Sequence, residues 1–490
     1  MNKIISYLLL LSCSIFSVSS DIYSLEEYID YLTHDHSTPQ LLNSKRSISK
    51  SNLILNEGIS DWSVQSSAFS NHIEPFQTSG FVSSGIDRFG TSLELKKPLL
   101  LSGGAFSFGF LNEKVTQAEV LFNGISLNEP IYYENKLFIS FQQPLLYGLF
   151  GESLELPIIV ASSNVGQTEF STTEEFENFF LSELTDYVDW ALAYEVTELS
   201  FSRLQLARES LKQTQERVKV NLSEKIDLLR AEFSVQQAHQ LWLTQKATLK
   251  SVQFKFSSKL NNQGILSRVP KYELYETVYV KKPSYIVVEH LRSVKQLDLG
   301  TAPLTKQLQL SQSKRNGSLT LNSRYDLLAG SSTFSDNYKF QNNNFSVSLN
   351  YSRPLSDVQS IETVNINKEK LNQHQLNRSQ LLIDLESEII SLYTLIEEYK
   401  KILNTTLNQI IIAQEKASAE EKLYDQGRSS LDMVIQSQDN VLNSKLNYAN
   451  LSASYQKLIL TYQALVDELL DSYKVSLKDV KTTDNSDTIL

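Results

Sequence analysis

Few residues in this sequence are spaced as a catalytic or metal-binding group would be, and the closest such group is His34-Asp35-His36. Three consecutive residues cannot all face one ion on regular structure, and the sequence has no matching cluster elsewhere, so a solvated loop explains them better than a metal site. The chain also lacks a phosphate-binding loop, a nucleophile elbow and a dinucleotide fingerprint. We therefore expect no enzyme activity, no cofactor and no bound metal.

Two breaks in long helical sequence are more informative. The stretch YDQGRSSLDMVIQSQDN (424–440) places Gly427 in a glycine-poor region, and VKVNLSEKIDLLRAEFS (218–234) has the same offsets with Asn221 at the matching position. Gly tolerates a left-handed backbone freely and Asn is the next best tolerated residue. Both breaks therefore predict tight turns between antiparallel helices, with Ser223 and Ser429 available to cap the helix that follows.

The helices that these turns join have a coiled-coil pattern. Apolar and small residues recur at 3-4 spacing over 434–465, and 187–218 follows the same rhythm with a polar gap at Thr197. Leu228, Val235, Trp242 and Leu249 make a row with a spacing of seven. Only 16 Gly and 10 Pro occur in 490 residues. This pattern indicates long helices packed side by side rather than a compact enzyme.

The order of helix, strands and long helix pair occurs twice, which indicates an internal duplication. Residues 24–56 are helix-like with a break at Pro39, and PSYIVVEHLRSVKQL (283–297) is also helix-like. In the strand-like segments SLTLNSRYDL and NFSVSLNYS, apolar and polar residues alternate. Such alternation fits an ordinary sheet over a soluble core, or strands with one face toward lipid and one toward a water-filled lumen. The segment 90–111 reads as an extra hairpin that either extends these strands or lies at their base.

The N-terminus predicts export. A basic start, an apolar run from Ile4 to Phe16 and small residues before Asp21 form a signal peptide with cleavage after Ser20. Cys13, the only cysteine, is either a lipoprotein processing site or one more residue of this apolar run. The net charge of −11 and the lack of a basic tract argue against nucleic-acid binding.

Together these segments resemble the TolC-type outer-membrane efflux proteins over roughly residues 24–470. The two turn segments match that family's hairpin tips, SFQQPLLYG resembles its strand-to-helix passage, and the duplication fits as well. The resemblance implies a mainly α fold with a membrane β-barrel part. In that fold a duplicated helix–strands–long helical hairpin unit assembles as a trimeric α-barrel plus a shared β-barrel in the Gram-negative outer membrane, reaching into the periplasm. It also implies a homotrimer that works with a periplasmic adaptor and an inner-membrane pump.

The resemblance carries over specific residues. The adaptor-contacting turns match Val220, Asn221, Leu222, Gln426, Gly427 and Arg428. The positions of the family's closing tether are occupied by Tyr424 and Asp227. Its tethering arginine would fall on Ser429, with Arg428 one step early, and its acidic ring would fall on Met433 and Gln436, with Asp432 adjacent. The candidate gate residues are therefore Tyr424, Asp227, Asp432 and Arg428.

The expected organisation follows from these segments. It comprises a signal peptide (1–20), N-terminal helices (21–59), a first strand region (60–145), a first hairpin (146–265), second-repeat helices (266–316), a second strand region (317–356), a second hairpin (357–470) and a polar tail (471–490). The expected function is a gated exit duct of a tripartite efflux pump or a type I secretion system. The alternatives are an exported coiled-coil structural or adhesive protein and a periplasmic adaptor.

Overall fold

The computed structural model describes residues 22–74, 85–118, 120–122, 125–126, 128, 131–334 and 338–477. The expected signal peptide, with Cys13 and the cleavage site after Ser20, lies outside these residues, and so does most of the expected polar tail. None of the helices in this described part combines the length and apolar character needed to cross a lipid bilayer.

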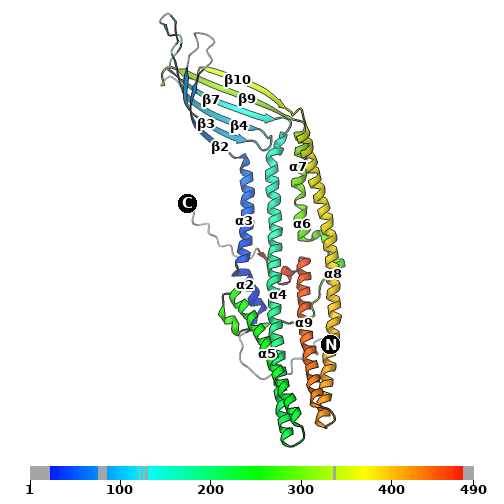
Figure 1. Ribbon diagram of the computed structural model, residues 1–490. Coiled ribbons are helices and arrows are strands. Elements are labelled where there is room, and N and C mark those ends of the chain that lie inside the picture. Colours follow the sequence, from blue (N-terminus) through cyan, green and yellow to red (C-terminus); the bar gives the residue numbers. More distant parts are fainter. Residues whose placement is uncertain are drawn as a thin grey trace. The chain divides into compact units, whose positions relative to one another are not determined.

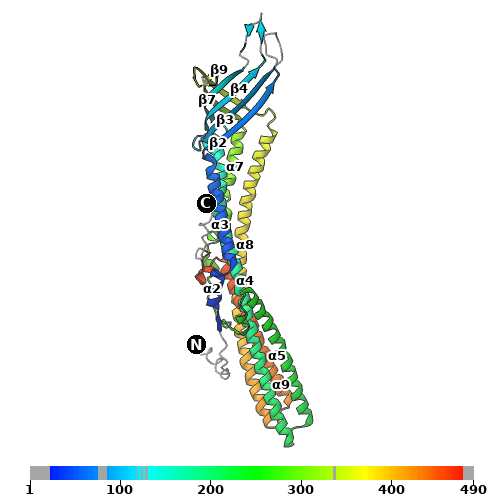
Figure 2. The ribbon, with the colours of Figure 1, turned by 90° about the vertical axis from the view of Figure 1, so that its left-hand side faces the viewer.

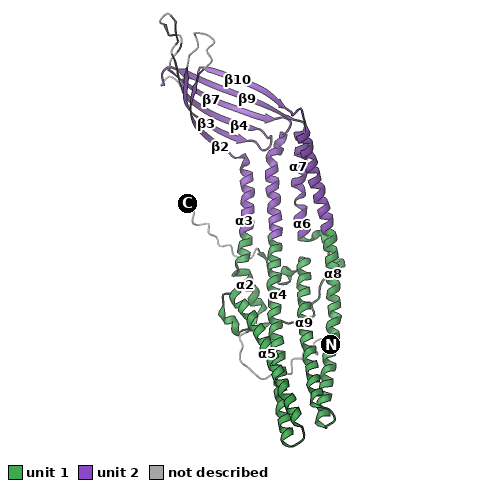
Figure 3. Cartoon of the chain, in the orientation of Figure 1, with its two compact units in different colours: residues 1–43, 172–292, 382–490 green, residues 44–171, 293–381 purple. Residues whose placement is uncertain are grey.

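The chain divides into two compact units, which are coloured separately in Figure 3. Unit 1 comprises residues 1–43, 172–292 and 382–490, and unit 2 comprises residues 44–171 and 293–381. The two longest helices, α4 (Glu152–Lys219) and α8 (Val358–Asp425), each contribute to both units.

Unit 2 contains a six-stranded antiparallel sheet in the order β10-β9-β7-β4-β3-β2 (Figure 1). Its strands are β2 (Ser63–Ile73), β3 (Ile86–Pro98), β4 (Ala105–Gln117), β7 (Ile131–Pro144), β9 (Ser318–Ser331) and β10 (Asn342–Ser352). Strands from the two sequence repeats meet where β7 pairs with β9. The segment 90–111 supplies most of β3 and β4, so it extends the sheet and includes two of its inner strands.

The pairing register gives this sheet one apolar and one polar face. Directly paired residues on one face form an apolar row across all six strands: Val64, Leu95, Phe108, Ile139, Tyr325 and Phe345. The adjacent row, on the opposite face, is polar: Ser63, Lys96, Ser107, Ser140, Arg324 and Ser346. Five of the six apolar residues are exposed in the single chain. The alternation expected from the strand sequences is therefore present, and no core covers its apolar side in the described residues.

Shorter helices of unit 2 pack along the ends of the long ones. They are α6 (Arg292–Asp298) and α7 (Thr301–Lys314). Arg378 on α8 holds Asp298 through two hydrogen bonds of 2.5 and 3.2 Å, and Ser163 on α4 donates a 2.6 Å hydrogen bond to the carbonyl of Leu299. These contacts fix α6 beside both long helices, because each bond joins segments far apart in the sequence.

Unit 1 contains the turns of two long helical hairpins and the helix segments that flank these turns. The first joins α4 to α5 (Lys225–Lys259) and the second joins α8 to α9 (Leu431–Leu465); each hairpin's helices run side by side in Figures 1 and 2. The helices have 68 and 35 residues in both hairpins. The predicted duplication is therefore reproduced in helix length.

The buried seam of α4 is more polar than the heptad pattern suggested. Thr197, which looked like a gap in the seam, is buried and donates a 2.7 Å hydrogen bond to the carbonyl of Ala193. Ser200, Ala207 and Thr214 continue a buried row at spacings of seven. Small side chains that bond to their own helix let neighbouring helices approach closely without leaving polar groups unsatisfied.

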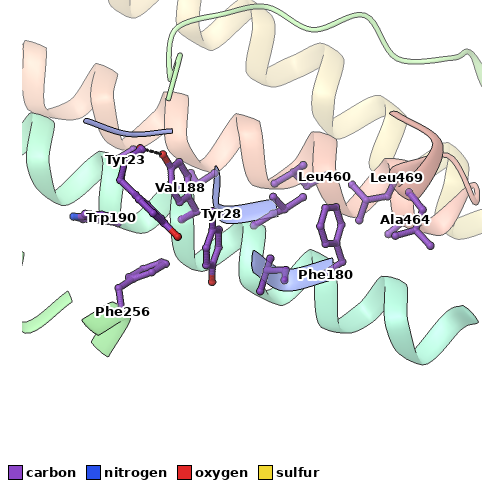
Figure 4. Close-up of a cluster of buried hydrophobic side chains, with 14 of the residues drawn as sticks. Tyr23, Tyr28, Phe180, Val188, Trp190, Phe256, Leu460, Ala464 and Leu469 are labelled. Carbon is purple, nitrogen blue, oxygen red and sulfur yellow. Dashed lines mark hydrogen bonds between the residues drawn. The ribbon is translucent and has the colours of Figure 1, made fainter. Parts of the chain in front are cut away.

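An aromatic core in unit 1 joins the N-terminal segment to the hairpins (Figure 4). Strand β1 (Ile22–Ser24) pairs with β8 (Val269–Lys271), and α2 (Leu25–His34) follows it. The ring of Tyr28 stacks on Tyr187 at 5.5 Å and meets Phe256 edge-on at 5.4 Å. Ring contacts of this kind add to the area that the aromatic side chains bury.

Three expectations about local structure were wrong. The helical break near the N-terminus lies at Asp35-His36, and Pro39 belongs to the first turn of α3 (Ser37–Glu57), where its missing N–H has no helical partner to lose. The stretch 272–291 contains only short 3-10 turns, at Pro283–Tyr285 and Val288–His290, before α6. The expected polar tail begins as packed structure, since α10 is Leu469–Ser472 and Leu477 is buried.

Candidate functional site: the paired hairpin turns

The two hairpin turns share one backbone geometry. Asn221 has φ of 58° and Gly427 has φ of 70°, so both adopt the left-handed conformation that the sequence predicted. The N–H of Asn221 bonds to the carbonyl of Val218, and that of Leu222 bonds to Arg217. Gly427 and Arg428 repeat this pattern with Tyr424 and Leu423. Asn at the first turn is therefore compatible with the same helix ending that Gly gives at the second.

The helix after each turn begins one residue later than expected. Glu224 and Ser430, not Ser223 and Ser429, are the N-caps, and each follows the left-handed residue by three positions. The chain needs two residues after the left-handed one before it can enter the next helix. Ser223 and Ser429 are therefore free to point elsewhere: Ser429 donates a 2.7 Å hydrogen bond to Glu420.

Arg217 contacts both Tyr424 and Asp425 of the other hairpin, and the sequence alone did not identify it as a candidate residue. Its guanidinium carbon lies 4.5 Å from the centre of the Tyr424 ring, and its Nη1 lies 3.2 Å from the Asp425 carboxylate. The hydroxyls of Tyr424 and Ser223 are 3.4 Å apart. Within one chain, Tyr424 of the second hairpin is therefore held by two residues of the first. Arg217 sits in the last turn of α4, one turn before Asn221, where a cation also suits the helix dipole.

Asp227 is engaged at its own helix terminus. Its Oδ2 accepts a 3.3 Å hydrogen bond from the backbone N–H of Glu224 in a capping box, and its Oδ1 lies 3.4 Å from Arg230. Among the described residues of the single chain, no hydrogen bond joins Asp227 to Tyr424. The structure thus brings Tyr424 to the first hairpin, but its partners there are Arg217 and Ser223.

The other candidate residues lie on the surface of the turns. Arg428 is exposed, and its side chain forms no ion pair with a described residue. Asp432, Met433 and Gln436 are exposed in the first turns of α9. The remaining turn residues expected to contact an adaptor are exposed as well: Val220, Asn221, Leu222, Gln426 and Gly427.

An apolar stripe continues from the first turn along α5. Leu222, Ile226, Leu229 and Phe233 are all exposed in the single chain, at spacings of four, three and four. This is the spacing of one helix face in a coiled coil. Such a face is suited to packing against another helix.

Three ion pairs join the two hairpins at regular intervals along α4. Asp189, Arg203 and Arg217 are spaced by two heptads, so they share one face of the helix, and they pair with Lys457, Asp439 and Asp425. Arg203 is the most buried: only 5% of its side chain is exposed, and it also bonds to Ser234 on α5 at 3.2 Å. Both partners of the Arg217–Asp425 pair are more exposed than those of the Arg203–Asp439 pair, so solvent screens the ion pair at the turns more strongly.

One carboxylate cluster has the residue types of a metal site. Glu174, Glu177 and Asp467 bring their oxygens together, and Glu177 is almost fully buried. The guanidinium of Arg292 pairs with Glu177 and lies 3.0 Å from Asp467. Burial raises the pKa of Glu174, which Arg292 partly counteracts and Asp467 reinforces. The arginine already occupies the position that a cation would take, so this cluster is an internal ion-pair network.

His34 and His36, which the sequence analysis considered as metal ligands, have different partners in the structure. His34 pairs with Asp30 at 3.0 Å, whereas His36 packs its ring against Phe179 at 4.7 Å. Burial lowers the pKa of His36, which the Glu183 charge partly opposes. The two rings therefore do not converge on a common site.

Comparison with known proteins identifies the fold. A scan of the sequence against protein-family models finds no match, and neither does a search of curated proteins. Solved structures do match. The CmeC outer membrane channel of Campylobacter jejuni is 13% identical with a TM-score of 0.65, over 94% of this chain and 90% of that one.

Two further structures agree. The outer membrane protein VceC of Vibrio cholerae is 10% identical with a TM-score of 0.63, over 92% of this chain and 96% of that one. The open state of the MtrE outer membrane channel of Neisseria gonorrhoeae is 11% identical with a TM-score of 0.59, over 93% and 94%. These likenesses confirm the expected resemblance to TolC-type proteins at the level of the fold.

Proposed function

We propose that this chain, which has the fold of outer-membrane channel proteins, is the outer-membrane exit duct of a tripartite efflux pump or a type I secretion system. The observation that carries the proposal is a six-stranded sheet with an uncovered apolar face in the same chain as two matched long hairpins. An exported coiled-coil scaffold would account for the hairpins but not for that face. The duct conducts its cargo without chemical change.

The duct is a homotrimer in this proposal. The sheet ends in two edge strands, β2 and β10, and the outer edge of each has no strand partner among the described residues of one chain. Open edges cannot face lipid, because unpaired N–H and C=O groups there cost several kcal/mol each. Pairing β2 of one subunit with β10 of the next removes both edges in a shared β-barrel, and the hairpins then form the α-barrel in the periplasm.

The gate of the duct lies at the Asn221 and Gly427 turns. We assign the closed state to contacts of Tyr424 and Asp227, with Arg428 and Asp432 exposed beside them and available to a neighbouring subunit. Polar contacts at the ends of long helices form a two-state element with a gap of a few kcal/mol, which a partner can bias by binding one state better.

The partner that opens the gate is a periplasmic adaptor linked to an inner-membrane pump. The exposed turns offer it Val220 and Leu222 beside the polar Gln426 and Arg428. The stripe Leu222, Ile226, Leu229 and Phe233 offers a helix face at coiled-coil spacing. Both features fit a helical hairpin as the docking partner.

The direct test is planar-bilayer conductance of the detergent-extracted protein, measured together with its mass in detergent. A trimer with a small, stable conductance supports the closed duct. In this trimer, Tyr424→Phe combined with Asp227→Ala should raise the conductance, because both proposed tether groups are lost.

A matched variant separates the tether from the helix cap. Asp227→Asn keeps an oxygen for the N–H of Glu224 but loses the charge, so it reports on the tether without removing the cap. An unchanged conductance in the double variant would refute the assigned gate residues. A soluble, non-conducting rod that needs no detergent would refute the duct itself.

A further inference from the structure

The sheet of a single chain contains a complete additional hairpin, β3–β4, between β2 and β7. We propose that this hairpin is part of the barrel wall, so that three chains close an eighteen-stranded barrel rather than one built from β2, β7, β9 and β10 alone. The inference rests on the trimeric duct proposed above and concerns the width of its outer-membrane part.

The pairing of this hairpin is complete on both sides. The β2–β3 pair extends from Ser63 opposite Lys96 to Ile73 opposite Ile86, and the β4–β7 pair extends from Ala105 opposite Gln142 to Thr116 opposite Ile131. A hairpin folded aside from the wall would leave β2 and β7 to pair with each other. Instead, β2 pairs with β3 and β7 pairs with β4, so β2 and β7 do not pair with each other.

The hairpin also continues both faces of the sheet. Leu95 and Phe108 belong to the apolar row, and Lys96 and Ser107 belong to the polar row. On the polar side Arg88 of β3 lies 3.5 Å from Glu113 of β4. On the other face Asn112 of β4 bonds to the directly opposite Asn135 of β7. A one-residue slip would exchange the two faces, so this register suits a wall between lipid and water.

The connecting turn of the hairpin is fastened beside the passage from β7 into α4. Gln143 donates a 2.6 Å hydrogen bond to the carbonyl of Ser102. Gly103 has φ of 74°, and a Cβ added there would lie 2.1 Å from the carbonyl oxygen of Gly148. The turn in KKPLLLSGG (96–104) and the turn in QQPLLYG (142–148) are therefore in contact, which anchors the β3–β4 turn beside that passage.

The edge strands fit closure with a second copy. β2 and β10 both have 11 residues. Because six antiparallel strands separate the two edges by an odd number of reversals, β10 runs opposite to β2, and the new pair is antiparallel like all the others. An even strand number is also the rule for bacterial barrels.

The consequence is a wide outlet. At a strand spacing of ~4.8 Å and a tilt of ~40°, eighteen strands give a backbone diameter of about 36 Å, against about 24 Å for twelve. Inward side chains that reach roughly 5 Å leave a lumen of about 25 Å. That space accommodates two α-helices of ~10–12 Å side by side. The barrel lumen is therefore wide enough for a partly folded polypeptide. The size of the cargo is limited at the hairpin turns and not in the barrel.

Disulfide trapping tests the strand order in the full chain with Cys13→Ser. The Oγ atoms of Ser67 on β2 and Ser92 on β3 are 2.7 Å apart, and Ser107 on β4 pairs with Ser140 on β7. Ser67→Cys with Ser92→Cys, and separately Ser107→Cys with Ser140→Cys, should oxidise to intrachain disulfides in outer membranes, as mass spectrometry of the peptides will show. The matched control combines Ser67→Cys with cysteine at Phe138, Ser140 or Gln142 in turn, and it should stay reduced.

The diameter is then measured on end-on electron-microscopy images of the detergent-solubilised trimer. A barrel diameter of about 36 Å, together with disulfides at both the 67/92 and the 107/140 cysteine pairs, supports the proposal. A trimer of about 24 Å, or a β2–β7 disulfide in the control, overturns the proposal while leaving the duct intact. A protein that forms no trimer fails the proposed function itself, so the two failures are distinguishable.

Discussion

The hydroxyl of Tyr28 donates a 2.5 Å hydrogen bond to the carboxylate of Glu183, 155 residues later in the chain. The same carboxylate accepts two hydrogen bonds of 2.8 Å from Lys259 on α5. Lys259 also bonds to Asp186 at 2.7 Å, and Asp186 in turn accepts from Lys255. One network, buried at Tyr28 and Glu183, therefore joins α2 to both helices of the first hairpin.

Tyr28→Phe should lower the free energy of unfolding of the N-terminal region by about 1–3 kcal/mol, because a hydrogen bond to a charged group is lost in a buried place. Denaturant unfolding in detergent, followed by circular dichroism, measures the change. Tyr31→Phe is the matched control, since the Tyr31 hydroxyl reaches only a backbone carbonyl at 3.1 Å and should cost less. Equal losses in the two variants would contradict the special role of Glu183.

Stability should fall on the acid side through Asp186. Burial alone would raise the pKa of this carboxyl, but hydrogen bonds from Lys255 and Lys259 outweigh it and hold the pKa below its usual range. A lowered pKa in the folded state stabilises above the unfolded value of ~3.9, and this contribution is lost as the pH falls through the folded value. In Asp186→Asn, the unfolding free energy measured against pH should decline less below about pH 4 than in the parent protein.

Glu174 and Glu177 should respond oppositely to neutralisation. The raised pKa of Glu174 means that its ionised form costs stability in the folded state at neutral pH, and this cost disappears as the pH falls toward the unfolded value of ~4.3. Glu174→Gln should therefore leave stability at pH 7 unchanged or raised.

Glu177→Gln should instead destabilise by roughly 3–5 kcal/mol, because it leaves Arg292 with less compensation in a buried site. Thermal unfolding of both variants at pH 7 compares them directly. A larger loss of stability in Glu174→Gln than in Glu177→Gln would contradict the assignment of Glu177 as the main partner of Arg292.

Arg217→Gln should loosen the turns. It removes the contact with the Tyr424 ring and the pair with Asp425, so the single-channel conductance of the closed trimer should rise several-fold. Arg217→Lys keeps the charge but not the planar guanidinium group. Its conductance should therefore lie between those of the parent protein and Arg217→Gln. If Arg217→Gln conducts like the parent, the contact within one chain does not hold the gate.

The left-handed turns predict an order among substitutions at Gly427. A Cβ there meets nothing within 4 Å, so only backbone strain counts. Gly427→Ala should cost roughly 1–2 kcal/mol in unfolding free energy, and Gly427→Asn should cost less, since Asn221 already holds φ of 58° at the first turn. Asn221→Gly should be neutral or slightly stabilising. Equal costs for Ala and Asn at position 427 would contradict the strain argument.

The sequence by itself determined the repeating parts of this protein. Turn positions at Asn221 and Gly427, helix pairs and alternating strands all follow from local rules: a positive φ favours Gly or Asn, and spacings of two or three to four place side chains on one face. The expected fold was implied by the resemblance to TolC-type proteins, which the order of these parts supports. The positions of the helix caps were wrong by one residue, because the number of residues that a turn uses is not encoded by cap preference alone.

Only the tertiary structure decided which distant residues meet. The partners of Tyr424, the burial of Arg203, the Tyr28–Glu183 bond and the place of β3–β4 in the sheet each depend on segments brought together from remote parts of the chain. No periodicity marks such contacts, since a polar residue on a helix face looks alike whether it meets water or another helix. For the same reason Thr197 resembled a gap, although it belongs to the buried seam.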